Sequence, residues 1–346
     1  MTITFQEACA QVCAPGTRFE IQEVDVAGVP TKVFAGTPPN MRHLFAAAAA
    51  RTDDFIVFED ERWPMPRVLE LIGQIGHALV HELRVTNGDR VAIAMRNYPE
   101  WIAAFAAITA VGAVAVPMNA WWQTDEMVFA LDDSESRVVI ADADRLNRMR
   151  AAEPGSITAT VVTVREHAEP LADDPFAVVA LDALLTPGTT LPDVDIDPDD
   201  DVTIFYTSGT TGAPKGAQLT HRGSVHNLMN MVFMAMVQAV ADAKATAAGG
   251  AADDPGEESP SGDDGRRVFM ASTPLFHVTA NNCVLHPGTI AGGTIVLMYR
   301  WDPGRALELI ERERVTNFSG VPVMSRELLA HPDWSKRDTS SMKGMG

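Results

Sequence analysis

Residues 202–216 read VTIFYTSGTTGAPKG, and this stretch decides how the rest of the chain is interpreted. Its first five residues are β-branched or aromatic, which is typical of a buried strand. Four hydroxyl residues follow around two glycines, and the stretch closes with Pro-Lys-Gly. Glycines let backbone amides approach an anion closely, hydroxyls donate hydrogen bonds, and a lysine adds positive charge. The stretch therefore predicts a phosphate-binding loop at the end of a strand.

The loop differs from the Walker pattern, in which Gly-Lys precedes Ser or Thr, because Lys215 lies between Pro214 and Gly216. A plain turn is the alternative interpretation, since Ser, Thr and Gly are common in turns. Residues 221–240 carry apolar residues at helical spacing, and Thr220 is a suitable N-cap. A strand, a loop and a helix in series favour a nucleotide site, because a helix N-terminus attracts phosphate.

Away from this loop, short β-branched runs alternate with helical patterns. Such alternation predicts an α/β fold with mostly parallel sheets, and the number of strands favours two sheets over one. The expected strands are Arg90–Met95, Ala113–Pro117, Arg137–Ala141, Thr160–Val164, Val202–Tyr206, Val268–Ser272, Thr294–Met298 and Thr316–Gly320. The expected helices are Pro66–Leu83, Glu100–Val111, Thr124–Asp132, Pro303–Glu313 and Val321–Ala330.

Three segments need a separate interpretation. The apolar stretch Ile102–Met118 has 17 residues and predicts a buried helix running into a buried strand, since a membrane span needs about 20 strongly apolar residues. Residues 191–201 read LPDVDIDPDDD and predict a solvated connector, because their spacing lacks the glycine and the final glutamate of a calcium loop. Residues 241–267 contain no Val, Ile, Leu, Met or aromatic residue and predict a mobile acidic insertion.

Composition limits the function classes. The 346 residues carry a net charge of −19, so nucleic acid is an improbable partner and any phosphate ligand needs a local positive site. The first ten residues lack a basic region followed by an apolar core, so no secretion signal is expected. Three cysteines argue against a disulfide framework and for a reducing compartment, here the cytoplasm.

Residues 206–216 resemble the signature phosphate loop of the adenylate-forming superfamily, which includes acyl-CoA synthetases, the adenylation domains of peptide synthetases and beetle luciferases. In chain order, residues 108–127, PLFH at 274–277 and NFSGVPVM at 317–324 also resemble segments of that superfamily. The resemblance implies its large amino-terminal domain, with two α/β subdomains and a β-barrel portion. We expect the first subdomain in 1–200 and the second, incomplete, in 201–346.

The resemblance also implies roles for individual residues. The loop would hold the β- and γ-phosphates of ATP, Thr207 would contact Mg²⁺, and His277 would orient the carboxylate of the acid. Lys215 and His277 are thus the catalytic candidates; the alternative for His277 is a core histidine, and for the wall at 320–322 an ordinary turn. The implied phosphate-binding residues are Ser208, Gly209, Thr210, Thr211, Gly212, Lys215 and Gly216, and the implied acid-pocket residues are Phe276, His277, Gly320, Val321 and Pro322.

The function implied is ATP-dependent activation of an apolar carboxylic acid to an acyl-adenylate, followed by thioester formation with coenzyme A. The family's later motifs and small carboxy-terminal domain would follow residue 346, so we expect a truncated chain that is inactive alone. Four other interpretations stay open: adenylation of an amino acid for a carrier protein, an inactive nucleotide-binding fragment, a dimerisation fragment that forms a homodimer, and a P-loop ATPase.

Overall fold

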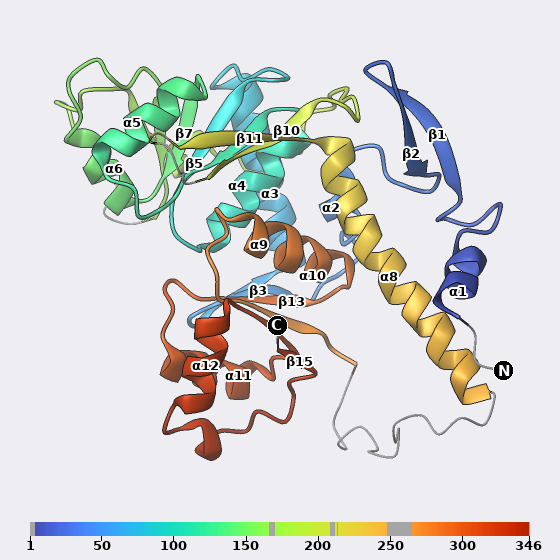
Figure 1. Cartoon of the computed structure of the whole chain (residues 1–346). Coiled ribbons are helices and arrows are strands. Elements are labelled where there is room, and N and C mark those ends of the chain that lie inside the picture. The colour runs from blue at the N-terminus through green and yellow to red at the C-terminus, as the bar shows by residue number, and fades with distance from the viewer. Residues whose placement is uncertain (1–3, 166–169, 208–211, 213, 248–264, 346) are drawn as a thin grey trace.

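The computed structural model describes residues 4–165, 170–207, 212, 214–247 and 265–345. These residues form three sheets and the helices that cover them (Figure 1). The helices are α1 (Phe5–Val12), α2 (Arg42–Ala46), α3 (Met65–His81), α4 (Pro99–Ala110), α5 (Thr124–Asp133), α6 (Ala143–Arg150), α7 (Leu181–Leu184), α8 (His221–Ala247), α9 (Val278–Ala280), α10 (His286–Ile290), α11 (Pro303–Glu313) and α12 (Pro322–Ala330), with a π-helix at Asn281–Leu285 and a 3-10 helix at Trp334–Lys336.

The larger sheet has seven strands in the order β11-β10-β6-β5-β7-β8-β9, and all neighbours are parallel except β11 and β10. Its central strands are short and rich in Val, Ala and Ile, and all their residues except Arg90 are buried, as expected for a parallel sheet with both faces covered. The strands are β5 (Arg90–Ala94), β6 (Val114–Pro117), β7 (Val138–Ala141), β8 (Thr160–Thr163), β9 (Val178–Ala180), β10 (Asp201–Thr207) and β11 (Lys215–Thr220).

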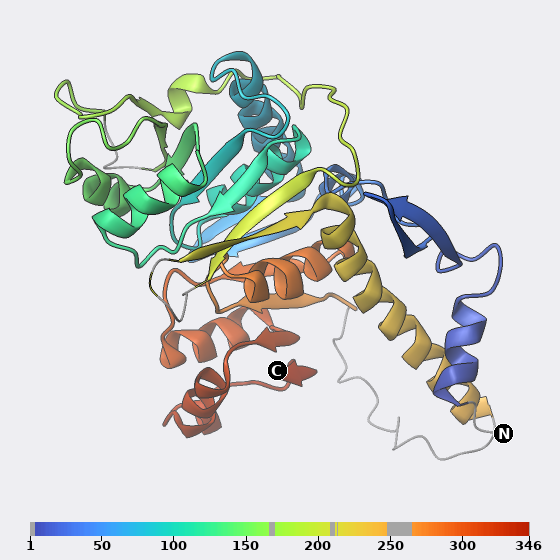
Figure 2. The ribbon, with the colours of Figure 1, turned by 45° about the horizontal axis from the view of Figure 1, so that its top comes forward.

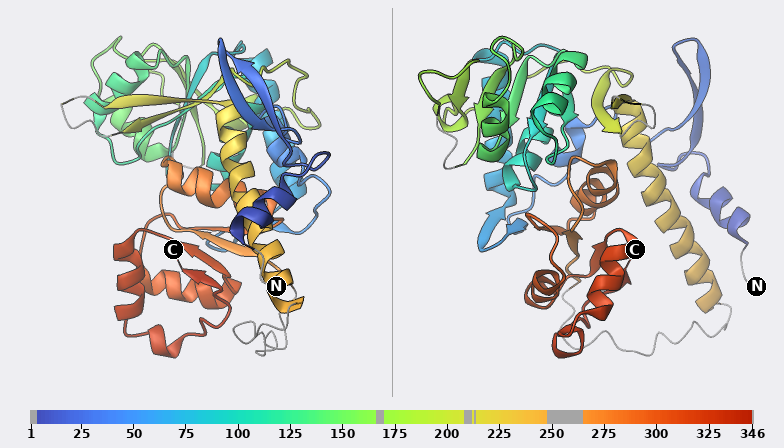
Figure 3. Two further views of the ribbon diagram at one scale, coloured as in Figure 1. Left: turned by 45° about the vertical axis from the view of Figure 1, so that its right-hand side comes forward. Right: turned by 60° about the vertical axis from the view of Figure 1, so that its left-hand side comes forward.

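The second sheet has six strands in the order β15-β14-β12-β13-β3-β4, with only β3 and β4 antiparallel. Figure 3 shows it below the seven-stranded sheet, with α11 and α12 at its far end. The strands are β3 (Asp54–Phe58), β4 (Glu61–Pro64), β12 (Val268–Ala271), β13 (Thr294–Leu297), β14 (Asn317–Ser319) and β15 (Gly344–Met345). The third sheet is the hairpin of β1 (Ile21–Val26) and β2 (Val29–Phe34), which stands apart from both.

The eight expected strands and five expected helices are all present, and 102–118 is a buried helix followed by a buried strand. The sheets do not divide the chain at 200/201, however. β10 and β11 join the sheet of the first half, while β3 and β4 join the sheet of the second half. The implied β-barrel portion has no counterpart among the described residues, where every sheet is open. Strand pairing between distant segments, which local composition does not report, accounts for the mixed membership of the two sheets.

Helix α8 runs along the side of both sheets and reaches α1 at its far end (Figure 2). It continues to Ala247, so the first seven residues of the expected mobile insertion are helical; the Ala-rich sequence ADAKATA has high helix propensity. Residues 248–264 of that insertion lie outside the described residues. By length and composition alone, His221–Ala243 could cross a membrane; 28% of its apolar stretch is buried inside the protein, and Leu228, Met229 and Val237 lie in the core.

The aspartates of the connector at 191–201 bind the chain itself. Asp199 forms an ion pair with Arg222 at 2.6 Å, and the amide of Asp199 donates to Asp197. The Asp200 carboxylate accepts a hydrogen bond from the side chain of Asn87 at 3.0 Å. These contacts fix the approach to β10 and the start of α8.

The two large sheets meet through the side chain of Asn97, which follows β5. Its amide nitrogen donates to the Thr273 carbonyl at 3.0 Å, and its oxygen accepts from the Leu275 amide at 2.8 Å. Only 5% of Asn97 is exposed, so water does not compete for these bonds. One side chain from the seven-stranded sheet thereby fixes the backbone that follows β12 of the other sheet.

Replacing Asn97 by alanine would leave the Leu275 amide and the Thr273 carbonyl without this partner. An orphaned buried group costs about 1–3 kcal/mol, so we expect Asn97→Ala to lower the free energy of unfolding by about 3 kcal/mol, measured by urea denaturation. The control is Asn230→Ala on the exposed side of α8, where we expect a change within about 0.5 kcal/mol. Equal stability of the two variants would contradict the role of Asn97.

A second buried polar side chain makes stability depend on pH. His286 on α10 is 1% exposed, packs against the Phe105 ring, and has no hydrogen-bond partner for either ring nitrogen among the described residues. Burial lowers the pKa of His286 to about 3. The unfolded chain takes up this proton near pH 6.5 and the folded chain only near pH 3, so this group removes stability as the pH falls through that range.

We therefore expect His286→Leu to weaken the acid sensitivity of the protein. Between pH 6 and pH 4, the free energy of unfolding of the wild type should fall more steeply than that of the variant, by up to about 1.4 kcal/mol per pH unit. Urea denaturation at a series of pH values measures both slopes. Parallel curves for the two proteins would mean that His286 takes up its proton in the folded state as readily as in the unfolded one.

Candidate functional site

The predicted phosphate loop joins β10 to β11, which form an antiparallel hairpin at the edge of the seven-stranded sheet. Thr207 and Lys215 pair with each other at the end of the hairpin where the loop begins and ends, and both are exposed. Gly212 has a φ of 128° with no atom near the position of a side chain. Gly216 lies so close to Ile204 that a Cβ would come within 2.7 Å of it, which requires glycine. Ser208, Gly209, Thr210 and Thr211 lie outside the described residues.

The expected series of strand, loop and helix is wrong in one respect, because β11 lies between the loop and α8. Thr220 does accept a hydrogen bond from the Gly223 amide, as an N-cap does. However, β11 is six residues long and rises about 3.3 Å per residue, so the start of α8 lies about 20 Å from Lys215. The helix therefore begins at the opposite end of the strands from the loop and cannot contact a phosphate held there.

The PLFH motif follows β12 of the other sheet. His277 is exposed and caps α9, where its ring nitrogen Nδ1 accepts from the Thr279 amide at 3.3 Å. The alternative of a core histidine is thus excluded by its exposure. Phe276 beside it is half-buried. Both residues lie just past the segment that Asn97 fixes.

The predicted pocket wall at 320–322 lies on the neighbouring strand of the same sheet. Ala271 at the end of β12 pairs with Ser319 at the end of β14, and the Ser272 hydroxyl donates to the Ser319 carbonyl at 2.8 Å. Parallel pairing therefore brings Phe276, His277, Gly320, Val321 and Pro322 to one edge of the sheet. Val321 and Pro322 are exposed and form a turn into α12, while Gly320 lies against the Phe318 ring.

Two adjacent tryptophans after β6 connect the predicted phosphate loop with the predicted acid motif. Trp122 packs edge-on against Tyr206 at the end of β10, with ring centroids 5.7 Å apart. Trp121 packs edge-on against Phe276, with ring centroids 5.3 Å apart. The carboxyl ends of β10, β6 and β12 thus face one another, which is where ligands bind in open parallel sheets.

Sequence reasoning assigned no role to Trp121, Trp122 or Asn97. Trp121 is 52% exposed and lies beside Phe276. The tryptophans follow β6 and Asn97 follows β5. These positions could have marked them as candidates, because the loops after parallel strands carry functional residues in α/β folds. Their partners lie on distant segments, which the sequence alone does not identify.

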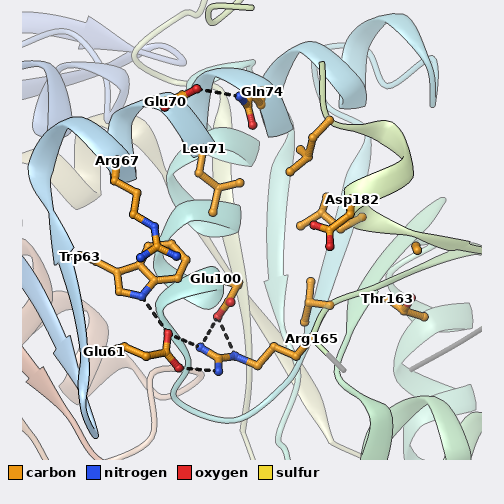
Figure 4. Close-up of a pocket in the computed structure, with 14 residues that line it drawn as sticks. Glu61, Trp63, Arg67, Glu70, Leu71, Gln74, Glu100, Thr163, Arg165 and Asp182 are labelled. Carbon is orange, nitrogen blue, oxygen red and sulfur yellow. Dashed lines mark hydrogen bonds and ion pairs between the residues drawn. The ribbon is translucent and has the colours of Figure 1, made fainter. Parts of the chain in front are cut away.

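A separate cavity of about 530 Å³ lies between β4, α3, α7 and the ends of β8 and β9 (Figure 4). Arg165 forms ion pairs in it with Glu61 at 2.8 Å and with Glu100 at 3.0 Å. Burial raises the pKa of Glu100, although Arg165 opposes this change. Glu70 and Asp182 add two further carboxylates. With four acids and two arginines in its lining, this cavity does not suit an oligophosphate, and it contains none of the predicted site residues.

The described residues of the loop fit an oligophosphate. Lys215 and Thr207 are exposed at its two ends, and Lys215 forms no ion pair within the described part of the chain. The described residues contain no group of three or more His, Cys, Asp or Glu arranged for a metal. The site thus offers a cation and a hydroxyl next to an apolar surface, which suits an anionic headgroup joined to an apolar body.

Known proteins resemble this chain in sequence and in fold. Feruloyl-CoA synthase of an Amycolatopsis species is 31% identical over 259 residues, which cover 75% of this chain and 44% of that enzyme. 4-Coumarate–CoA ligase 2 of Oryza sativa subsp. japonica is 30% identical over 315 residues, covering 88% of this chain and 49% of the ligase. The solved structure of a Mycobacterium tuberculosis fatty acyl CoA synthetase matches with a TM-score of 0.67 and 25% identity, covering 88% of this chain and 54% of that one.

The chain spans about half the length of the curated relatives it matches. Within this chain, the family described as AMP-binding enzyme matches residues 44–346, which include the phosphate loop, the PLFH motif and both large sheets. On this evidence the chain belongs to the family of AMP-binding enzymes, whose members among its relatives are acyl-CoA ligases.

Proposed function

We propose that the protein containing these residues is an acyl-CoA ligase that activates an apolar carboxylic acid with ATP and transfers the acyl group to coenzyme A. The observation that carries this proposal is the pair of contacts Tyr206–Trp122 and Trp121–Phe276. Through them, the hairpin that holds the phosphate loop lies beside the motif assigned to the acid. The names of the relatives support the same class of reaction.

The chemistry suits a site with few titrating groups. A carboxylic acid has a pKa of about 4 to 5, so it is ionised at neutral pH and attacks the α-phosphorus without a general base. The protein must instead hold two anions in line and neutralise the charge that develops on the departing pyrophosphate. Lys215, Thr207 and the loop between them would hold the β- and γ-phosphates. Mg²⁺ bound near Thr207 would supply further positive charge.

The surface next to the loop supports an apolar acid. Four apolar side chains in the segments that follow β6, β12 and β14 are between 41% and 52% exposed: Trp121, Val278 at the start of α9, Val321, and Val323 in the first turn of α12. Exposed apolar side chains that gather at one place mark a binding surface. The acyl group, aromatic or aliphatic, would cover them, and His277 would donate to its carboxylate. No aspartate lies in 268–282 to pair with the amine of an amino acid.

The main test is Lys215→Ala in the whole protein. Loss of this cation should lower the rate of acid-dependent exchange of pyrophosphate into ATP about a hundredfold, because charge on the departing pyrophosphate is no longer neutralised. Exchange is measured with labelled pyrophosphate against a panel of aromatic, aliphatic and amino acids.

Lys336→Ala is the matched control, since Lys336 is an exposed lysine that pairs with Asp333 outside the site. Its exchange rate should stay within about twofold of the wild type, as expected for an isolated surface ion pair. Equal rates for the two variants would remove the phosphate loop from the mechanism. Phosphate release without an acid would indicate an ATPase instead.

A further inference from the structure

Arg96 occupies an unusual position between the two sheets. Its guanidinium lies over the Trp121 ring at 5.3 Å and over the Tyr299 ring at 5.5 Å. Trp121 follows β6 of the seven-stranded sheet, and Tyr299 follows β13 of the six-stranded sheet. A planar guanidinium stacks on aromatic faces, so one arginine bridges a ring from each sheet.

The backbone of Arg96 is fixed from two sides. Its amide donates to the Asp142 carboxylate at 3.1 Å, and the next residue, Asn97, bonds the segment after β12. The side chain, in contrast, forms no ion pair within the described part of the chain, and its buried Nε has no partner there. Arg96 is thus held by ring contacts and not by a carboxylate.

The ring contacts of Arg96 lead directly to the proposed acid site. Trp121, which Arg96 covers, packs edge-on against Phe276 at 5.3 Å. The indole is 52% exposed, and apart from Arg96 and Phe276 no ring or cation contact is found for it among the described residues. Without the guanidinium, this large side chain would lose its stacking partner and gain access to other rotamers. Each such rotamer would change the shape of the surface that Trp121 and Phe276 present to the acid.

We propose that Arg96 is a positioning residue for acid binding: it holds the Trp121 indole against Phe276 and thereby sets the shape of the entrance to the acid site. This inference rests on the proposed function. Its specific consequence is that Arg96 changes the affinity for the acid and leaves the affinity for ATP and the chemical step unchanged. The reason is that Arg96 contacts Trp121, whereas the loop that would hold ATP follows Tyr206, which packs against Trp122.

The test measures kcat and KM for the acid and for ATP in the whole protein. Arg96→Met removes the guanidinium and keeps an unbranched side chain; it should raise the KM for the acid about tenfold and leave the KM for ATP and kcat within about twofold. Arg96→Lys keeps the charge without the planar stack and should recover less than half of this loss. Trp121→Ala should raise the KM for the acid similarly, and adding Arg96→Met to it should change little more.

The matched control is Arg67→Met. Arg67 also lies over an indole, that of Trp63 at 3.8 Å, but in the separate cavity shown in Figure 4. Its variant should keep the wild-type KM for the acid. An unchanged acid KM in Arg96→Met would overturn the inference, as would a parallel loss for acid and ATP, full recovery in Arg96→Lys, or multiplicative effects in the double variant. A wild-type protein without acid-dependent exchange would overturn both the inference and the proposed function.

Discussion

The geometry of the site depends on the bridge that Asn97 makes between the two sheets. Parallel sheets place their ligand-binding loops at the carboxyl ends of the strands, but two separate sheets share a ligand only if those ends face each other at a fixed distance. The buried Asn97 amide bonds the backbone at 273 and 275, directly before Phe276 and His277. A hydrogen-bonded pair excluded from water has little freedom to shift, so the acid motif is fixed relative to β5, and through Trp121 and Trp122 relative to the phosphate loop.

Much of the fold could be predicted from the sequence because its central strands are short, buried and rich in Val, Ile and Ala, with clear helical periods between them. Strand β11, in contrast, could not be predicted from the sequence. Its sequence KGAQLT has four exposed residues and pairs with β10 alone, so its composition carries no strand signal. Because β11 was not predicted, the helix α8 was expected to begin directly after the loop. Likewise, β3 joins the second sheet by pairing with β13, more than 200 residues away, and β4 follows because it pairs with β3; no local pattern reports the distant partner.

The sequence offered the motifs of the candidate site, and it did not offer the contacts that join them. The predicted phosphate loop and the PLFH motif could be proposed because each lies in one continuous segment. Asn97, Arg96, Trp121 and Trp122 contact residues that are distant in sequence, and the adjacent tryptophans carry no motif by themselves. Those contacts place the exposed Lys215 side of the seven-stranded sheet and the exposed Val321 and Val323 side of the six-stranded sheet around the same pair of tryptophans.

The most direct test of this account is a crystal structure of the whole protein with a non-hydrolysable acyl-adenylate analogue. The account predicts that the phosphate-equivalent group lies between Thr207 and Lys215. It also predicts that the acyl group lies within about 4 Å of Phe276 and Val321, the distance of apolar contact. An analogue bound in the cavity beside Arg165, or one whose acyl group points away from Trp121 and Phe276, would contradict the claim that the two carboxyl edges form a single site.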